Sequence, residues 1–202
     1  ASVSGNALTI SLKTAAGADP SGSDVVPITF RSTTATDGTM TTVNAVAATS
    51  VVLSAGSTVG LANNEYARLH VFAINNAGTV ELAVANFSAA AGISYITHGA
   101  SVLYGTLSTT AEGGAGAADG VGTYYSTTAR AGVAARYLGF VEVRTGATAG
   151  NWSNNPTHVQ VWTPELPLPG DVIQEGFVNG GGGSSSTSTS YVDITGASIT
   201  LT

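Results

Sequence analysis

The chain lacks cysteine and is poor in charged side chains. Without cysteine, it has neither disulfides nor thiolate metal sites. Charged residues make up 9% of its 202 residues, whereas ordinary soluble domains contain roughly 25%. The formal net charge is -6, and the six lysine and arginine residues form no cluster along the chain. Because nucleic-acid binding depends on neutralising several phosphates with basic side chains, we do not expect a nucleic-acid partner.

Long apolar runs are also missing. A helix that crosses a bilayer needs about 20 predominantly apolar residues, and no run approaches that length, so we expect no membrane insertion. The first residues lack the basic start and apolar core of a signal peptide. A chain of this kind that works outside a cell reaches it by another route, or its leader has been removed. With so few charges, mainly hydroxyls and amides remain to hydrate a monomer, and we expect much of the surface to be buried between subunits.

Residues 66–87 form the clearest period-two segment of the chain. Apolar residues alternate on both sides of the sequence Asn-Asn-Ala-Gly at positions 75–78, which predicts a β-hairpin. We expect residues 75–78 to be the loop, closed by a positive φ at Gly78. The expected register pairs Ile74 with Thr79, Val71 with Leu82, and Leu69 with Val84.

One face of this hairpin is apolar on both strands, and the other is mixed. The mixed face carries Arg68, His70, Phe72 and Glu81. It is too polar for a dry core and too aromatic for bulk solvent, so we expect it to meet another part of the protein or another subunit.

Further alternating segments predict strands at residues 7–13, 25–30, 39–48, 50–54, 93–107, 133–144 and 158–162. Pro27 cannot donate a ladder hydrogen bond, so its strand is expected at a sheet edge. In the strand at 133–144, Tyr137, Gly139, Val141 and Val143 are expected on one face. Val159 and Val161 are expected to point inward. Residues 111–122 are rich in glycine and alanine, which predicts a loop.

The C-terminal part changes character. Three prolines within residues 164–169 favour an extended exit from the preceding domain, and residues 180–190 are a Gly/Ser-rich, low-complexity sequence. A new alternating pattern then begins at Tyr191. We predict an all-β protein with an antiparallel β-sandwich or jelly-roll-like domain at residues 1–174, a linker at 175–190, and the first strands of a further, truncated β-module at 191–202.

Several segments resemble virion-associated proteins of tailed bacteriophages and prophages, a group labelled tail fibre or phage structural proteins. The segments that carry the resemblance include LANNEYARL at 61–69, STTAEGGA at 108–115, TAGNW at 148–152 and DVIQ at 171–174. Residues 184–202 are similar to the lead-in to a second module of such fibres. The resemblance implies a β-rich, usually trimeric, modular appendage located on the virion. It carries over no functional residues.

The histidines and carboxylates are the candidates for chemistry. No Gly-x-Ser-x-Gly elbow or HExxH spacing accompanies His70, His98 and His158, so strand-surface or interface histidines are favoured. His70 and His98 could still approach in a trimer, where copies of one histidine on the axis can hold an ion. A glycosidase would need two carboxyls roughly 5 to 9 Å apart. The candidates are scattered: Glu65, Glu81, Glu112, Asp119, Glu142 and Glu165. We expect Glu81 and Glu142 to pair with Arg68 or Arg144.

Aromatic residues offer a possible glycan or host-receptor surface. Tyr124, Tyr125, Trp152 and Trp162 stand near asparagine and threonine residues, although core or interface packing is the favoured interpretation. Trp152, in a turn between asparagines, is expected to be the better exposed, and Trp162 to lie in an interface.

The predicted function is a homotrimeric structural subunit of a phage tail or head fibre that contacts other virion proteins and mediates attachment to host-surface glycan. A carbohydrate-binding module, a capsid decoration or collar protein without receptor binding, and a bacterial surface adhesin or pilus-like subunit are the alternatives. We expect no enzymatic activity and assign no catalytic residue, cofactor or metal ligand.

Overall fold

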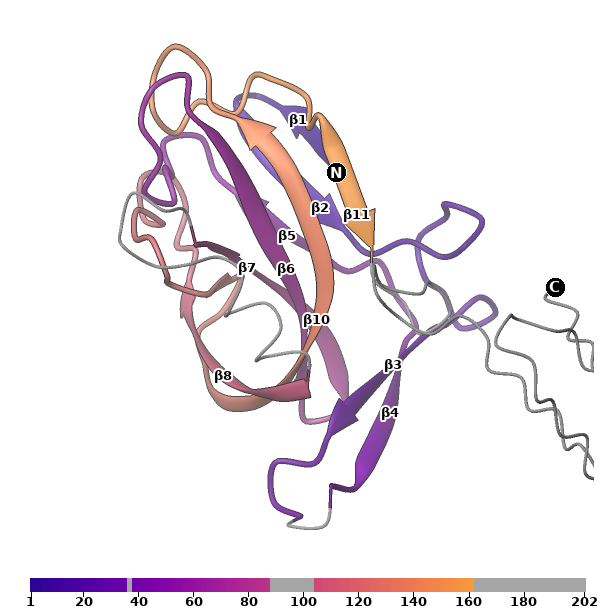
Figure 1. The fold of residues 1–202 in the computed structure, drawn as a ribbon. Helices are drawn as coiled ribbons and strands as arrows, with labels where there is room; N and C mark the ends of the chain where they lie inside the picture. The colour runs from indigo at the N-terminus through magenta and orange to yellow at the C-terminus, as the bar shows by residue number, and fades with distance from the viewer. Residues whose placement is uncertain (36–37, 88–103, 162–202) are drawn as a thin grey trace, which may run out of the picture. The chain divides into compact units, whose positions relative to one another are not determined.

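The computed structural model describes residues 1–35, 38–87 and 104–161. Every regular element in these ranges is a β-strand (Figure 1). The strands are β1 (Ser2–Ser4), β2 (Ala7–Ser11), β3 (Val26–Arg31), β4 (Met40–Ala45), β5 (Ser50–Leu53), β6 (Tyr66–Asn76), β7 (Thr79–Asn86), β8 (Tyr104–Ala111), β9 (Tyr125–Ser126), β10 (Arg130–Arg144) and β11 (His158–Val161). The all-β prediction is confirmed. The described strands belong to a compact unit, Ala1–Trp162, and the predicted linker and second module lie outside the described residues.

Five strands close into a barrel in the order β10-β6-β7-β9-β8, because β8 also pairs with β10. All of these pairs are antiparallel except β8 with β9. The interior is filled by aromatic and small side chains: Phe72, Ile74, Ala83, Ala85, Phe87, Leu107, Ala135 and Tyr137. The mixed face of the predicted hairpin therefore lies partly inside this barrel, where it meets other strands of the same chain.

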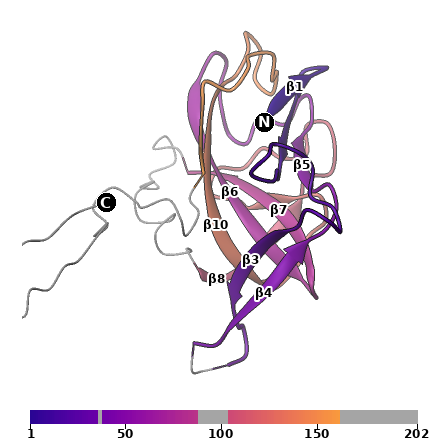
Figure 2. The same ribbon diagram turned by 90° about the vertical axis from the view of Figure 1, so that its right-hand side faces the viewer.

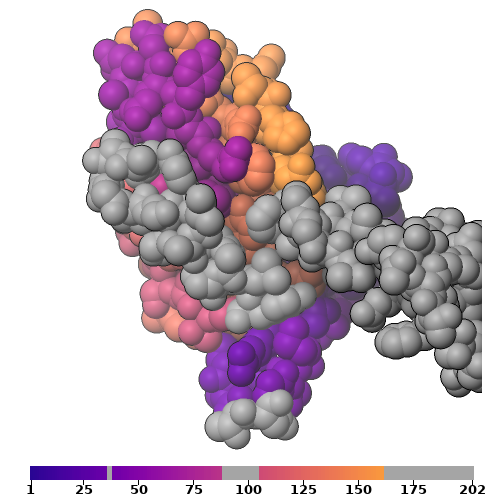
Figure 3. All heavy atoms as spheres, in the orientation of Figure 1, coloured from indigo at the N-terminus to yellow at the C-terminus, as the bar shows by residue number. Residues whose placement is uncertain are grey.

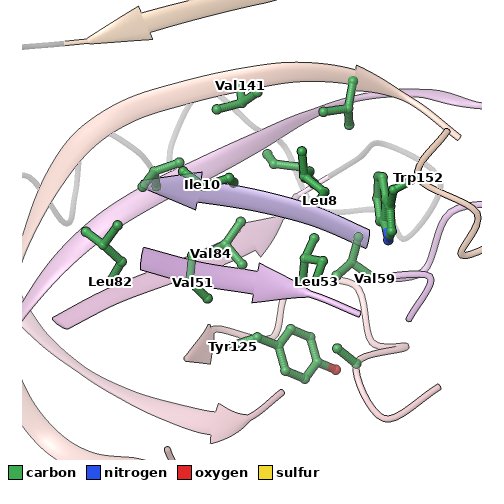
Figure 4. Close-up of a cluster of buried hydrophobic side chains, with 14 of the residues drawn as sticks. Leu8, Ile10, Val51, Leu53, Val59, Leu82, Val84, Tyr125, Val141 and Trp152 are labelled. Carbon is green, nitrogen blue, oxygen red and sulfur yellow. The ribbon is translucent and has the colours of Figure 1, made fainter. Parts of the chain in front are cut away.

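A second layer covers part of the barrel's outer wall. The three-stranded sheet β1-β2-β5 and the two-stranded sheet β3-β4 pack there, and Figure 2 shows β1 and β5 set apart from β6 and β10. Alternation in β2 turns Leu8 and Ile10 toward Val84 of the barrel wall and toward Val141 of β10 (Figure 4). Each such buried side chain contributes about 1.5 to 3 kcal/mol. The finer prediction of a sandwich or jelly roll is not confirmed.

The β6–β7 turn is tighter than predicted. Asn76 pairs with Thr79, so the loop has only two residues, Ala77 and Gly78, with φ of 48° and 93°. Two consecutive positive φ values match the twist of the strands, as in a type I′ turn, and Asn75 Oδ1 accepts a hydrogen bond from Gly78 N at 2.8 Å. The predicted register was wrong by two residues: Ile74 pairs with Glu81, Val71 with Val84, and Leu69 with Asn86. A shift by two preserves the faces.

A β-bulge divides β10 into two halves. Tyr137 pairs with Phe72 but Gly139 pairs with Val71, so Leu138 is an extra residue in the strand. The bulge reverses the alternation, and Tyr137 lies in the barrel while Val141 and Val143 pack against the outer layer. The prediction that these three residues share a face was therefore wrong.

At the bulge, β10 exchanges one neighbouring strand for another, while β6 stays paired with it on the other side. Before it, residues 130–136 pair with β8 and close the barrel; from Gly139 onward, the partner is β11. Gly139 has φ of 137°, and a Cβ at this position would lie 1.9 Å from Gln160 O. Only glycine permits this close approach. Gly139 thus allows the sheet to continue beyond the barrel as the open strands β6, β10 and β11.

Three further sequence predictions concern Pro27, the valines of β11 and the glycine-rich loop. Pro27 lies in a two-stranded sheet and thus in an edge strand, as predicted. Val159 and Val161 do not point into a core: their side chains are 48% and 47% exposed. The predicted loop at 111–122 is confirmed except at Ala111, which is the last residue of β8.

Candidate functional site

The open part of the sheet presents a polar and aromatic face. The side chains of this open-sheet face are Tyr66 and Arg68 from β6, Phe140, Glu142 and Arg144 from β10, and His158 and Gln160 from β11. They share one side of the sheet because they are cross-strand partners or alternate along a strand. In Figure 3, orange atoms of the last described strands lie at the surface close to purple atoms from the beginning of the β6 region.

Cross-strand contacts order these side chains. Arg68 donates a hydrogen bond of 2.6 Å to Glu142 Oε1, and its Cζ lies 3.9 Å from the centre of the Phe140 ring. Phe140 is also 6.0 Å from the His158 ring, measured between ring centres. The Arg144 Cζ lies 5.0 Å from the centre of the Tyr66 ring. Each of the two arginines on this face therefore has its guanidinium group held against an aromatic ring.

The stability that these contacts supply is small. An exposed ion pair contributes about 0 to 1 kcal/mol, and an exposed cation–π contact about 0.5 to 1 kcal/mol. The side chains of Arg68 and Glu142 are both more than a third exposed. The arrangement instead positions an accessible ring and several N–H donors on a rigid sheet. Such a surface can stack on a flat apolar face and donate hydrogen bonds to oxygen atoms.

The face passes continuously into the barrel at His70, which pairs with Phe140. His70 is only 5% exposed, and its Nδ1 lies 2.9 Å from the Tyr137 hydroxyl. Burial raises the pKa of the Tyr137 hydroxyl above its ordinary value. Because His70 is buried against barrel residues, its ring is not presented to a neighbouring copy, and metal binding by a histidine on a trimer axis stays a prediction. His98 lies outside the described residues.

The carboxylate candidates for glycan cleavage that lie in the described ranges have structural contacts, and Glu165 lies outside the described residues. Glu142 pairs with Arg68, as predicted, but Glu81 pairs with Arg130 through hydrogen bonds of 2.8 Å and 2.5 Å. The Arg130 guanidinium holds the pKa of the Glu81 carboxyl below its ordinary value. Glu65 caps a turn by accepting from Ala62 N at 2.6 Å.

Glu112 and Asp119 anchor the glycine-rich loop to residues 54–58. Glu112 accepts from the N and Oγ of Ser54, from Ser57 Oγ and from Gly114 N, all within 3.0 Å. Burial alone would raise the pKa of the Glu112 carboxyl, but these hydrogen bonds outweigh it and the pKa is lowered. Asp119 accepts from the N and Oγ1 of Thr58 at 2.9 Å.

The predicted aromatic candidates do not form one surface. Trp152 is 1% exposed, within the cluster that joins the two layers, and its Nε1 donates to Ser57 O at 3.0 Å. The prediction that Trp152 is exposed was therefore wrong. Tyr125 is buried in the same cluster, whereas Tyr124 packs with its ring edge-on to Phe72 at the barrel interior. Glycan contact by the partly exposed Tyr124 stays a prediction; Trp162 lies outside the described residues.

The turn sequence around Trp152 misled the prediction because its partners come from elsewhere in the chain. The hydrogen-bond acceptor, Ser57 O, is 95 residues away in sequence. Conversely, the open-sheet face was missed because it depends on pairing β6 with β10. The sequence did contain one signal. In an antiparallel register, Arg68 stands across from Glu142 and Tyr66 across from Arg144, so that each arginine faces a suitable partner.

Within the described ranges, no group of three or more histidine, aspartate or glutamate side chains is placed to hold a metal ion. No helix in those ranges has the length and hydropathy to cross a membrane. Comparison of the chain with protein-family models, curated proteins and solved structures gave no match.

Proposed function

We propose that this chain is a structural subunit of a bacteriophage virion appendage, a tail or head fibre, that assembles as a homotrimer and meets the host surface. The all-β fold and the sequence resemblance of several segments to phage fibre proteins support this proposal. The packing of a β-layer on the wall of a barrel also supports it, since an appendage needs a rigid body.

The observation that carries the proposal is the outer edge of β11, which no other described strand covers. Among the described strands, β11 has one partner, β10, and its sequence His-Val-Gln-Val has no lysine, carboxylate or proline. Monomeric proteins usually protect an edge strand with such residues, because free backbone N–H and C=O groups can pair with another chain. The exposed Val159 and Val161 add apolar surface at the same edge. A neighbouring copy would cover both.

Other uncharged surface supports assembly. Exposed apolar side chains elsewhere in the described part include Val25, Met40, Val46 and Val52. The β3–β4 pair presents hydroxyl groups, with Thr29 Oγ1 and Thr42 Oγ1 at 3.0 Å. Neutral faces of this kind pack between subunits without the cost of desolvating charges.

Sedimentation equilibrium at micromolar concentration tests the assembly. We expect a trimer for the unaltered chain and weakened association for Val159→Lys/Val161→Lys, because two charges at the edge oppose strand pairing. Ala15→Lys/Ala16→Lys is the matched control, since both residues are exposed and lie in a turn outside the strands, and it should remain trimeric. A stable monomer would contradict the proposal, and a fully trimeric double variant would exclude β11 as the contact.

Immunolabelling of intact particles tests the location. We expect an antibody against this chain to label a tail or head appendage in negative-stain images. Label confined to the capsid wall or collar would favour the alternative of a decoration protein without receptor binding. Label absent from particles would remove the virion assignment altogether.

A further inference from the structure

We propose that the open-sheet face binds saccharides that carry carboxylate groups, such as uronic-acid polysaccharides. This inference rests on the proposed function, because an appendage that meets a host surface encounters such glycans. It names the chemical class of the ligand and the residues that bind it.

The accessible ring is Tyr66. Its side chain is 66% exposed at the beginning of β6, and Arg144 lies directly across from it on β10. An aromatic ring with an exposed face can stack on the apolar side of a pyranose, while its hydroxyl remains free for hydrogen bonds. The barrel and the paired strands hold this ring on a rigid element, which limits the entropy lost on binding.

The charge of the face selects an anionic partner. It carries two arginines against one carboxylate, Glu142, in a chain whose net charge is -6. Ion pairs among the described residues join Lys13 to Asp19, Arg68 to Glu142, and Arg130 to Glu81. Arg144 has no carboxylate partner among those residues. Its contacts are the Tyr66 ring and a long 3.4 Å hydrogen bond from Nε to Asn64 O.

Arg144 can therefore donate its terminal N–H groups to a ligand carboxylate in a bidentate pair. A sugar stacked on Tyr66 would place an attached carboxylate beside that guanidinium. Arg68 and His158 are further hydrogen-bond donors on the same face. Both lie directly across from Glu142, which is two residues before Arg144 on β10. A chain of acidic sugars fits this row better than nucleic acid, which needs many more phosphate contacts for useful affinity.

The ligand class is tested with hexagalacturonate as the acidic probe and the corresponding neutral galactose oligomer as its comparison, by isothermal titration with the full chain. We expect binding of the acidic probe alone, weakened at high salt. Arg144→Gln and Tyr66→Ala should each reduce the affinity at least tenfold. Arg31→Gln is the matched control, since Arg31 is an exposed arginine on β3, away from the face, and it should leave binding unchanged.

Arg144→Lys separates geometry from charge. It should recover only part of the affinity, because an ammonium group cannot form the bidentate pair. Circular dichroism and thermal unfolding establish that each variant is folded. Equal binding of acidic and neutral probes, binding that survives both Arg144→Gln and Tyr66→Ala, or no binding of hexagalacturonate would overturn the inference.

Sedimentation of the same variants distinguishes failure of this inference from failure of the proposed function. If Tyr66→Ala and Arg144→Gln dissociate the assembly, the face is a contact between copies of the chain and the saccharide site is excluded. If the proteins are trimeric but the unaltered chain binds no hexagalacturonate, or the variants bind it as tightly as the unaltered chain does, the appendage proposal stands without this ligand. Trimers that lose binding would support both.

Discussion

Individual residues in this protein are held by partners far away in the sequence. Glu112 shows this most clearly, because it is 6% exposed and all its donors belong to two loops. A buried carboxylate is stable only where such donors surround it. Glu112 thus serves as a fixed connection between two segments of the chain.

Replacement of Glu112 by glutamine should destabilise the protein by about 1 to 3 kcal/mol at pH 7. The amide keeps one acceptor oxygen but turns an NH2 group toward donors that previously faced the second carboxylate oxygen. Urea unfolding followed by tryptophan fluorescence measures the change. Asp24→Asn, at an exposed loop position, should change stability by less than about 0.5 kcal/mol; equal effects of the two substitutions would show that the hydrogen bonds of Glu112 are unimportant.

Truncation of Trp152 should cost about 3 to 5 kcal/mol, because it leaves a cavity between the layers and an unpaired Ser57 carbonyl. Tyr66→Ala removes an exposed aromatic side chain and should cost less than about 1 kcal/mol. Thermal unfolding of both variants provides the comparison. A Trp152→Ala protein as stable as the unaltered chain would contradict the buried position of the ring.

At the scale of elements, turns and bulges decide how strands meet. The two-residue turn between β6 and β7 places a non-glycine residue, Ala77, in the left-handed region. The bulge in β10 allows one strand to belong both to the barrel and to the open sheet. Each feature stores a small backbone cost that a single substitution can relieve or increase.

Ala77→Asn should stabilise the protein by about 0.5 to 1 kcal/mol, since asparagine tolerates the left-handed conformation and Asn-Gly is the preferred sequence of this turn. Ala77→Val should act in the opposite direction, because a β-branched residue is strained there. Ala77 is exposed, so packing does not complicate the comparison. Chemical unfolding of the pair checks the sign, and a destabilised Ala77→Asn would contradict the assigned turn.

Gly139→Ala should detach β11 from β10, because the new methyl group would collide with Gln160 O. Hydrogen exchange measures this as a loss of amide protection in β11. Gly17→Ala is the control: Gly17 also has a positive φ, 80°, but nothing lies within 4 Å of its Cβ position. It should cost about 1 to 2 kcal/mol from backbone strain alone, without any change in β11. Unchanged protection in Gly139→Ala would contradict the predicted detachment.

At the scale of the whole molecule, the protein has few charged groups, so the pH dependence of its free energy of unfolding comes from a small number of titratable side chains. Glu81 and Glu112 both have a pKa lowered from an ordinary value of 4.5. A carboxyl whose pKa is lower in the folded state contributes its full stability above the unfolded pKa. That stability is lost as the pH falls through the folded pKa, since protonation then favours the unfolded chain.

We therefore expect the free energy of unfolding to be insensitive to these groups between pH 6 and 7 and to fall progressively below about pH 4.5. Urea titrations at a series of pH values measure the slope. Glu112→Gln should show a shallower decline than the unaltered chain, because one of the two titrating groups is gone. The same slope in both proteins would exclude Glu112 as a source of acid sensitivity.

Much of the strand content could be predicted from the sequence, because period-two alternation is a local property of a few neighbouring residues. Leu8 and Ile10 point into the core as expected, and the central hairpin keeps its predicted faces. The short polar strand β1 had no such signal. The bulge at Leu138 was also hidden, since nothing local distinguishes an extra residue from continued alternation.

By itself, then, the sequence determined an all-β chain with few charged side chains and the identity of its apolar faces. The tertiary structure decided that the mixed face of β6 enters a barrel at one end and meets solvent at the other. It also decided that Trp152 is buried and that Arg68, not Arg144, is the partner of Glu142. The physical reason is that barrel closure and cross-strand pairing depend on residues about seventy positions apart, whose proximity no local pattern specifies.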